Sequence, residues 1–352
     1  MAVASLLCAL VGIVSSAPLV IVEDNSTVLN FNSLLVLLSA SVMLLAMALS
    51  FCLGVVALAQ ISVSGGRRTG RGFAVIAVAV PFIVVPLTVL LPALAKQRVI
   101  YRRMTCGKNL SDIGKAMIIY ASDYEDEFPR AGGRDTVWGG PGSVVWNALD
   151  RFQAYQLNAD GSGGRATISS CFYLLVKYSG VTAKSFVCKG DRGTREFKAG
   201  KYLRDKELVD FWDFGPVPTK HCSYTYHMPF CLYALTTSSE PGMAVAADRN
   251  PWIASPAARA KNMAGFSPGG TWQQQKYGNS ICHEEDGQQV LFMDGHVYFE
   301  KRAYCAINDD NIYTFWDGGD IRRGGAPVVG FTESTDRKDS FLVHDPLGPP
   351  RR

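Results

Sequence analysis

The apolar residues nearest the N-terminus form three long stretches, residues 2–22, 33–63 and 73–95. A bilayer core about 30 Å thick needs about 20 apolar residues, because a helix rises about 1.5 Å per residue. The second and third stretches meet this length, so we predict two transmembrane helices there. The first stretch is interrupted by glycine, serine and proline, and is either a third helix or a signal peptide. We therefore predict a membrane region with two or three transmembrane helices over residues 1–95.

A helical pattern of a different kind follows the third stretch. Its apolar positions recur at alternating steps of four and three: Cys106, Leu110, Ile113, Met117, Tyr120 and Tyr124. This spacing places them on one face of a helix. Phe128 and Pro129 close the pattern, because the residue before a proline is disfavoured in a helix. We predict an amphipathic spine helix over residues 96–129, and its apolar face needs something to pack on.

The rest of the chain has the pattern of a globular domain. We predict a head over residues 130–325, followed by a Gly/Pro-rich tail, 326–352, that adds little to the core. The glycine-rich segment 130–167 is predicted as turns and a long surface loop. A helix is predicted over residues 169–178, and a short strand entering a turn over 185–191.

Two further strand patterns follow in the head. Residues 222–230 form one, and residues 287–301 form two apolar runs on either side of Asp294 and Gly295. An Asp-Gly pair supplies the positive φ angles of a two-residue type I′ turn, so we predict a β-hairpin there. The predicted fold class is α+β, with N-terminal transmembrane helices and a long spine helix that continues into the head.

Charge divides the chain at the same place as hydropathy. Nearly all ionisable side chains lie beyond residue 95, and a net charge of +4 spread over both halves indicates no basic face. A nucleic-acid partner is therefore not expected. Seven of the nine cysteines also lie beyond residue 95, which suits an oxidising compartment. The chain has no CxxC pair and no HExxH run, so its spacing supports neither a structural zinc site nor a metalloprotease.

Charge counting alone does not decide on which side of the membrane the head lies. The loop between the second and third apolar stretches carries three arginines, and a larger basic group follows the third stretch: Lys96, Arg98, Arg102, Arg103 and Lys108. This count slightly favours a cytoplasmic head, whereas long domains translocate despite such charges and the cysteine content favours the outside. We predict a multi-pass membrane protein whose C-terminal head lies outside the cytoplasm.

Two resemblances extend this interpretation. The run ALAQISVSGGRRTGRGFAVIAVAV resembles a small two-helix bacterial membrane domain of unknown function, over about residues 34–85. The run LLPALAKQRVIYRRMTCGKNLSDIGKAMIIYASDYEDEFP resembles the N-terminal spine of planctomycete-type type II secretion pseudopilin-like (type IV pilin-like) proteins. The residues that match the second family are Cys106, Asn109, Leu110, Ile113, Gly114, Phe128 and Pro129.

The C-terminal half carries further similarity to the same family. Its His to Asp-Gly-His-Val signature is matched by His283, Asp294, Gly295 and His296, with His283 one residue farther from Asp294 than is usual. Residues 185–191 and 222–230 resemble the family's Cys-Pro-Ser-Asp turn and its Ser-Tyr-x-Tyr strand. Beside that resemblance, Cys188 with Cys222 is our first choice for a disulfide, although sequence does not prove connectivity.

One departure from the family bears on assembly. Pilin precursors are cut after a glycine, and a glutamate stands at the fifth position of the new chain to guide subunits into a filament. Here Gly72 and Phe73 could form such a junction, but the fifth position is Ala77 and two apolar stretches precede the site. We favour the interpretation that Gly72 and Phe73 belong to the two-helix membrane domain, and cleavage after Gly72 remains the alternative.

Several residues could in principle hold a metal or carry acid-base chemistry. Four histidines and three aspartates of the head are of the right type: His221, His227, His283, His296, Asp248, Asp286 and Asp294. Their spacing predicts no convergence. An acidic loop could bind calcium, as major pseudopilins often do, through Asp309, Asp310, Asn311 and Asp317. We expect no cofactor, with calcium at this loop as the open alternative.

The second resemblance implies that the outer half of the spine helix packs on the antiparallel β-sheet of a pilin-like head with long loops. Together with the residue patterns, it leads us to expect a membrane-anchored, extracytoplasmic pseudopilin-like protein of the inner (cytoplasmic) membrane, with a periplasmic head and without enzymatic activity. Its expected role is envelope assembly, protein secretion or surface interaction, and its expected partners are the lipid bilayer and secretion-system or other envelope proteins. A true pseudopilin assembled into a secretion pseudopilus is the first alternative. A metal-dependent hydrolase is the second, and a head that binds carbohydrate on Trp138, Trp146, Trp252 and Trp272 is the third.

Overall fold

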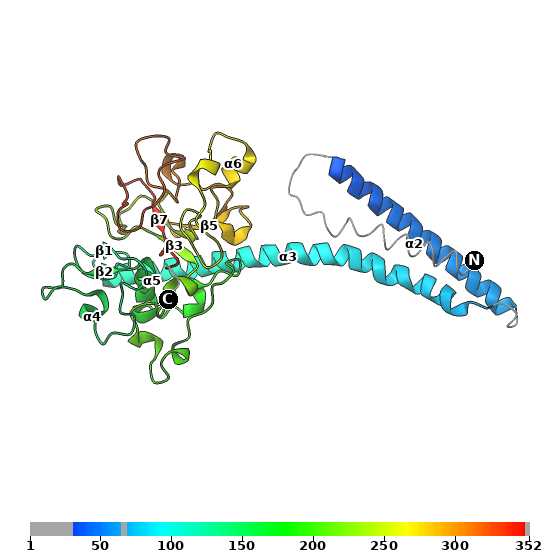
Figure 1. The fold of residues 1–352 in the computed structure, drawn as a ribbon, viewed down its shortest axis with the longest axis horizontal. Coiled ribbons are helices and arrows are strands. Elements are labelled where there is room, and N and C mark those ends of the chain that lie inside the picture. The colour runs from blue at the N-terminus through cyan, green and yellow to red at the C-terminus, as the bar shows by residue number, and fades with distance from the viewer. Residues whose placement is uncertain (1–30, 65–68, 349–352) are drawn as a thin grey trace. The chain divides into compact units, whose positions relative to one another are not determined.

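The computed structural model describes residues 31–64 and 69–348, which form a mixed helix and sheet structure (Figure 1). The chain divides into two compact units, Met1–Ile100 and Tyr101–Arg352, and the boundary falls inside one long helix. The predicted first apolar stretch, residues 2–22, lies outside the described residues.

The first unit contains helix α2, Phe31–Val63, and the beginning of helix α3, Arg71–Asp123. The segments Leu38–Val63 and Arg71–Thr88 are long and apolar enough to cross a membrane. Many of their large apolar side chains are exposed, as they would be if they faced lipid. Two helices of sufficient length and apolar composition therefore occur where residues 33–63 and 73–95 were predicted to cross a membrane, and the crossing itself stays a prediction.

Small side chains allow α2 and the first turns of α3 to pack closely. Ala74 and Ala77 of α3 are fully buried. A Cβ atom added to Gly54 of α2 would lie only 2.8 Å from the Cγ2 atom of Val78. The Ser50 hydroxyl donates a hydrogen bond of 3.0 Å to the carbonyl of Ala77. Gly and Ala at such positions are typical of helix pairs in membranes, where close packing replaces the hydrophobic effect.

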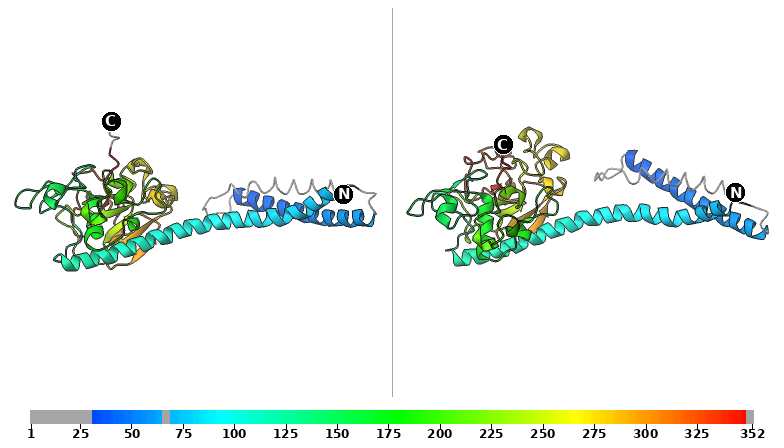
Figure 2. Two further views of the ribbon diagram at one scale, coloured as in Figure 1. Left: turned by 90° about the horizontal axis from the view of Figure 1, so that it is seen from below. Right: turned by 60° about the horizontal axis from the view of Figure 1, so that its bottom comes forward.

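In the second unit, α3 presents the predicted apolar face to the head. Cys106, Leu110, Ile113 and Met117 are fully buried, whereas Tyr124 at the end of the pattern is 40% exposed. Helix α3 is continuous, and Figure 2 shows its C-terminal part lying against the head. The helix ends at Asp123, six residues before the predicted end at 129, because the chain turns into positive φ angles directly afterwards.

A five-stranded antiparallel sheet forms the centre of the head. Its strands lie in the order β6-β5-β4-β3-β7, and every neighbouring pair is antiparallel. Their bounds are β3 Tyr224–His227, β4 Ala244–Asp248, β5 Gln288–Phe292, β6 Val297–Glu300 and β7 Leu342–Val343. Helix α3 approaches β5 closely at Gly114, where an added Cβ would lie 2.8 Å from Leu291 Cδ1.

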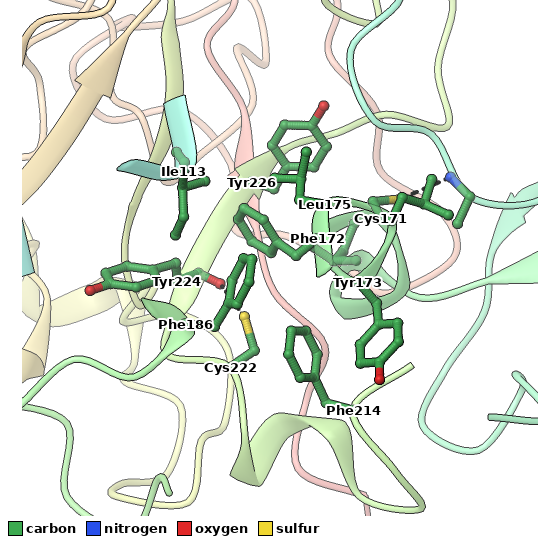
Figure 3. Packing of buried hydrophobic residues seen from close by; sticks show 14 of the residues in the cluster. Ile113, Cys171, Phe172, Tyr173, Leu175, Phe186, Phe214, Cys222, Tyr224 and Tyr226 are labelled. Atoms are coloured by element: carbon green, nitrogen blue, oxygen red, sulfur yellow. Dashed lines mark hydrogen bonds between the residues drawn. The ribbon is translucent and has the colours of Figure 1, made fainter. Parts of the chain in front are cut away.

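Both faces of strands β3, β4 and β5 are buried, whereas the edge strand β6 is partly exposed. Successive strand residues point to opposite faces, so Leu291 of β5 belongs to one core cluster while Val290 and Phe292 belong to the other. The larger cluster lies between the sheet, α3 and α5, Ile168–Tyr178, and Figure 3 shows Phe172 of α5 beside Tyr226 of β3. The predicted α+β class and antiparallel sheet are confirmed.

The other predicted elements of the head have mixed outcomes. The predicted helix 169–178 is α5, which begins at a capping box formed by Thr167 and Ser170. The predicted strand 222–230 contains β3. The predicted strand 185–191 is wrong, because a 3₁₀ turn, Ala183–Phe186, replaces it and leads into the turn at Cys188.

The predicted surface loop 130–167 contains short elements that were not expected. They are β1 Val137–Trp138, α4 Arg151–Tyr155 and β2 Arg165–Ala166, of which β1 and β2 pair in parallel. A further short helix, α6, spans Trp272–Lys276. Trp138 is 5% exposed and donates from Nε1 to Asp345, which ties the loop to the C-terminal segment.

The predicted β-hairpin over residues 287–301 is confirmed as β5 and β6, but its turn is of a different type. Gly295 has a φ of +85°, whereas Asp294 does not have the positive φ that a type I′ turn requires. The amide of Gly295 donates to the carbonyl of Phe292, and the amide of Phe292 donates to the carbonyl of His296. This is a three-residue loop with a glycine bulge, so the Asp-Gly signal located the turn and misjudged its length.

The C-terminal segment contributes to the core, contrary to the prediction for residues 326–352. Phe341, Leu342 and Val343 are fully buried, and β7 extends the sheet beside β3. The carboxylate of Asp345 accepts hydrogen bonds from the amides of Ile168 and Ser169 at the N-terminus of α5. A short apolar run after a Gly/Pro-rich stretch is sufficient for an edge strand, because that strand needs only one neighbour.

Candidate functional site: a buried cysteine, histidine and aspartate cluster

The two polar residues of the Cys-x-x-Asn motif attach α3 to the turn that contains Cys188. Cys106 forms a disulfide bond with Cys188, and the two Cα atoms lie 5.2 Å apart. One helical turn farther on, the Asn109 amide donates to the carbonyl of Val187 at 3.1 Å and to the Tyr224 hydroxyl at 3.2 Å. Residues three positions apart share a helix face, so this spacing lets both side chains reach the same segment.

The predicted disulfide between Cys188 and Cys222 is wrong. Cys222 is a free, buried cysteine, and Figure 3 shows its side chain among Phe186, Phe214 and Tyr224 in the aromatic core. Burial raises the pKa of its thiol to about 12, so this cysteine behaves as a small apolar residue. The partner of Cys188 is instead Cys106, on the face of α3 that packs against the head, whereas Cys222 belongs to the hydrophobic core.

Two more chemically active side chains converge on the disulfide. Asp248 is the last residue of β4, and His283 ends the 3₁₀ turn Ile281–His283, shortly before β5. His283 Nε2 lies 3.2 Å from Asp248 Oδ2 and 3.7 Å from Cys188 Sγ. Candidate ligand atoms of Cys106, Cys188, Asp248 and His283 all lie within 4.8 Å of one another, and all four residues are buried.

The hydrogen bonds of Asp248 leave one of its oxygens available. Oδ2 accepts from the backbone amide of Gln289 at 2.8 Å in addition to its contact with His283. Oδ1 is buried and has no hydrogen-bond partner among the described residues. An unsatisfied buried acceptor of this kind costs about 1–3 kcal/mol, more when it is charged.

The arrangement differs from that of a catalytic cysteine triad. In a triad, the imidazole uses one nitrogen for the nucleophile and the other for the orienting carboxylate. Here the same atom, His283 Nε2, faces both Cys188 Sγ and Asp248 Oδ2. The three groups therefore point at a common centre instead of forming a relay.

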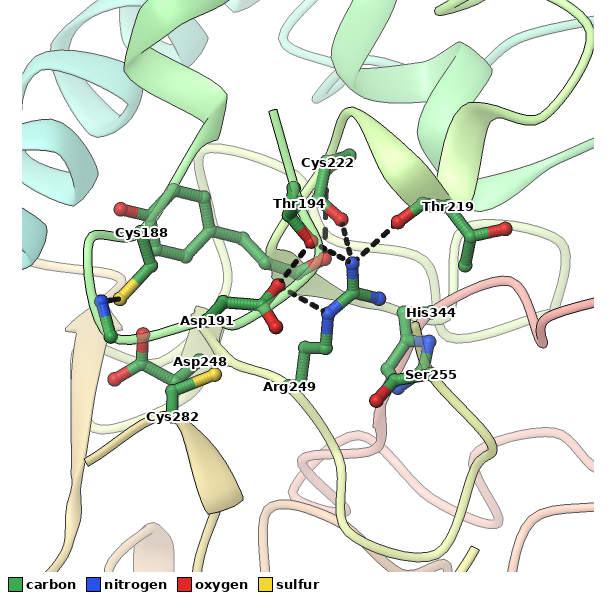
Figure 4. Close-up of polar contacts among 12 residues, drawn as sticks. Cys188, Asp191, Thr194, Thr219, Cys222, Asp248, Arg249, Ser255, Cys282 and His344 are labelled. Carbon is green, nitrogen blue, oxygen red and sulfur yellow. Dashed lines mark hydrogen bonds and ion pairs between the residues drawn. The ribbon is translucent and has the colours of Figure 1, made fainter. Parts of the chain in front are cut away.

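A second buried charged pair lies close to this cluster (Figure 4). Arg249 follows Asp248 in sequence, and its Nε donates to Asp191 Oδ2 at 2.6 Å while both side chains are almost fully buried. The guanidinium also donates to the backbone carbonyls of Thr219 and Cys222. The pair joins the segment after Cys188 to the end of β4, and so supports the backbone on two sides of the cluster.

No protein-family model, curated protein or solved structure matches the chain. The interpretation of the cluster therefore depends on its own chemistry.

Sequence reasoning included His283 and Asp248 among the possible metal or acid-base residues but missed that Cys106 and Cys188 join them. The other histidines lie elsewhere. His221 contacts the Tyr202 hydroxyl, and His227 contacts the carbonyl of Tyr233. His296 is exposed and pairs with Asp294 across the hairpin turn. Asp286 forms ion pairs with Arg103 and Lys276.

The acidic loop considered for calcium has other contacts. Asp310 Oδ2 accepts from the amide of Ser340, and burial raises the pKa of Asp310 to about 8. Asn311 donates to the carbonyl of Arg322, and Asp317 accepts from the amide of Gly319. Within residues 31–64 and 69–348, the only group of three or more His, Cys, Asp or Glu ligands is the Cys106 cluster, so calcium binding at Asp309, Asp310, Asn311 and Asp317 stays a prediction.

The four tryptophans considered as a carbohydrate platform do not share an exposed surface. Trp138 and Trp252 are each 5% exposed, and Trp146 packs against the ring of Phe211, whereas Trp272 is 47% exposed. Large aromatic side chains bury much apolar area, which explains why core positions take them.

Proposed function

We propose that this protein is a membrane-anchored, pseudopilin-like protein that holds a non-enzymatic head outside the cytoplasm, at the surface of the inner membrane. The observation that carries the proposal is the helix α3, which runs without interruption from an apolar segment into the core of the head. One helix therefore contributes residues both to the apolar segment and to the core of the head. Such a device suits tethering.

The attachment of α3 to the head supports the same role. Cys106 is covalently linked to Cys188, and Asn109 and Gly114 bring the helix into close contact with the head. The helix is therefore a part of the core that cannot separate from the head while the disulfide is intact.

The packing between α2 and α3 favours a permanent anchor over a processed pilin. Ala77, which stands where a pilin would have its glutamate, is fully buried and accepts a hydrogen bond from Ser50 of α2. Cleavage after Gly72 would release α2 and expose the small-residue face that includes Ala74 and Ala77. A subunit made for a filament would need a charged group at this position.

We further propose that the partners of the head are other envelope or secretion-system proteins. The exposed surface of α3 beside the head includes Tyr101, Met104, Ile118 and Ile119. Exposed apolar side chains on a membrane-proximal helix are suited to contact with a neighbouring helix or with lipid.

The mature N-terminus tests the anchor. The full-length chain should be produced in a bacterium that processes pilins, and its N-terminus determined by mass spectrometry beside a Gly72→Ala variant. The added methyl group of this variant meets no atom within 4 Å, so we expect no steric conflict. We expect neither protein to begin at Phe73. A wild-type chain that begins at Phe73 would overturn the permanent anchor, and loss of that cleavage in Gly72→Ala would assign the cut to Gly72.

The side of the membrane is tested separately. In intact spheroplasts, an externally added protease should digest the head, while a cytoplasmic marker protein stays intact. Full protection of the head until the membrane is lysed would place it in the cytoplasm and contradict the proposed location.

A further inference from the structure

The cluster of Cys106, Cys188, Asp248 and His283 has the composition and size of a metal site. A tetrahedral zinc ion lies about 2.3 Å from sulfur and about 2.0–2.1 Å from nitrogen or oxygen, so its ligands are about 3.3–3.8 Å apart. The four candidate donor atoms here lie within 4.8 Å of one another. The longest separation exceeds the ligand spacing of such an ion by about 1 Å, and the two sulfurs, bonded in the disulfide, can move apart once they are reduced.

The electrostatics of the cluster also favour a cation. Asp248 is fully buried, and its Oδ1 atom has no hydrogen-bond partner among the described residues. The single nitrogen Nε2 of His283 is shared between a carboxylate oxygen and a sulfur. A cation at the common centre would neutralise the Asp248 carboxylate and bind the lone pair of His283 Nε2. A proton on Nε2 would occupy that lone pair and would point toward only one of the two neighbouring groups.

The backbone around the cluster is closely packed. Gly190 follows Cys188 in the same turn, and a Cβ atom there would lie 3.1 Å from His283 Nδ1. The Gly190 amide also donates to Cys188 Sγ at 3.3 Å. Backbone N–H groups that point at sulfur are typical of environments that stabilise a thiolate, because they favour the charged form.

We propose that these four side chains bind one thiophilic divalent cation of the zinc type when Cys106 and Cys188 are reduced. A dithiol or phosphine reductant supplies two electrons to the disulfide, which takes up two protons and becomes two thiols. Each thiol releases its proton when its sulfur binds the metal, so metal binding liberates two protons in total. Two thiolates and the Asp248 carboxylate give the site three negative charges.

The disulfide and the metal are mutually exclusive states of the same site, since a sulfur bonded to another sulfur is not a thiolate. In both states α3 is attached to the turn at Cys188, through a covalent bond in one and through a shared ion in the other. The attachment of the helix is thus preserved under oxidising and reducing conditions.

The softness of the donors determines the class of metal. Two thiolates and one imidazole suit zinc and its spectroscopic substitute cobalt, whereas calcium and magnesium prefer oxygen donors throughout. The absence of CxxC spacing does not weaken the site, because its ligands come from four separate segments of the chain.

Cobalt binding to the full-length chain in detergent tests the proposal. The protein is reduced with a phosphine under argon, incubated with Co²⁺, separated from free metal and analysed for bound metal and absorbance. We expect one cobalt per chain, with thiolate-to-cobalt charge-transfer bands and the intense visible bands of tetrahedral cobalt. The oxidised protein, which is folded and unaltered in sequence, should bind none at this site.

Variants identify the ligands. Cys188→Ser and His283→Gln should each lose the stoichiometric cobalt, and Asp248→Asn should lower the affinity at least tenfold. Cys222→Ser is the matched control, because Cys222 is also buried but lies outside the cluster, and it should bind as the wild type does. Circular dichroism of each oxidised variant that retains both cysteines checks folding.

Three results would overturn the proposal. They are a reduced wild-type protein that binds no stoichiometric cobalt, binding that is equal in oxidised and reduced protein, and binding that survives both His283→Gln and Asp248→Asn. The last result would assign the metal to thiols alone.

Discussion

Reduction of the disulfide between Cys106 and Cys188 should destabilise the head by several kcal/mol when no metal is present. The bond links residues 82 positions apart, and the loop-entropy relation gives about 4.5 kcal/mol at 25 °C for a loop of this length. This value exceeds the contribution of almost any single side-chain contact. It is also a large share of the 5–15 kcal/mol by which a domain is usually stable.

The measurement is urea unfolding of the full-length chain in detergent, followed by near-ultraviolet circular dichroism and tryptophan fluorescence. A chelator is present throughout, so that no ion can replace the disulfide. The wild-type protein is compared with and without phosphine, and the Cys188→Ala variant is treated in the same way. We expect reduction to lower the free energy of unfolding of the wild type by about 3–5 kcal/mol.

The Cys188→Ala variant separates the bond from other effects of the reductant. It should resemble the reduced wild type, apart from the small loss caused by the missing sulfur, and phosphine should not change it further. A wild-type loss below about 1 kcal/mol would refute the reasoning, because α3 would then be held equally well by its noncovalent contacts. An equal effect of phosphine on Cys188→Ala would refute it as well.

Three further predictions follow from buried groups in the head. Asp191→Asn should lower the free energy of unfolding by about 3–5 kcal/mol, because it leaves the charge of Arg249 buried without its partner. Urea unfolding measures this, and a loss below about 1 kcal/mol would contradict the prediction. Gly114→Val should lower the free energy of unfolding by about 1–3 kcal/mol, because the new side chain overpacks against Leu291. Adding Leu291→Ala in the same chain should relieve part of that loss, and strictly additive losses in the double variant would contradict the contact. Burial and the nearby charge of Asp345 raise the pKa of Asp213 to about 7, so the folded state keeps a proton that the unfolded chain loses above about pH 4. The wild type should therefore lose stability relative to Asp213→Asn as the pH rises from about 4 to about 7, by up to about 4 kcal/mol, and a constant difference between the two proteins across this range would contradict the assignment.

The elements that depend on local periodicity were predictable from the sequence. The apolar stretches predicted α2 and the start of α3, and the steps of four and three predicted the buried face from Cys106 to Tyr120. Two apolar runs on either side of Asp294 and Gly295 predicted the hairpin of β5 and β6. In each case the signal lies within a few turns or a few strand residues, so no distant partner was needed to interpret it.

Other features depended on partners far away in the chain. The segment at Cys188 has the composition of a strand, but its backbone is turned toward α3 and does not join the sheet. The run from Phe341 to Val343 is too short to predict, and it becomes a strand because β3 offers a free edge. Propensity is a weak signal at such sites, since the neighbouring strand or helix decides the outcome.

The candidate metal site lies at the limit of what sequence can indicate. The sequence by itself supplied the residue types, and it fixed Cys106 and Asn109 on one helix face at a spacing that lets both reach the same neighbour. Only the tertiary structure brought Cys188, Asp248 and His283 to that face, from a turn, the end of β4 and a 3₁₀ turn. The physical reason is the distance along the chain over which each feature is determined. Helix periodicity depends on hydrogen bonds between residues four positions apart, whereas the convergence of the four ligands depends on how the sheet and α3 pack.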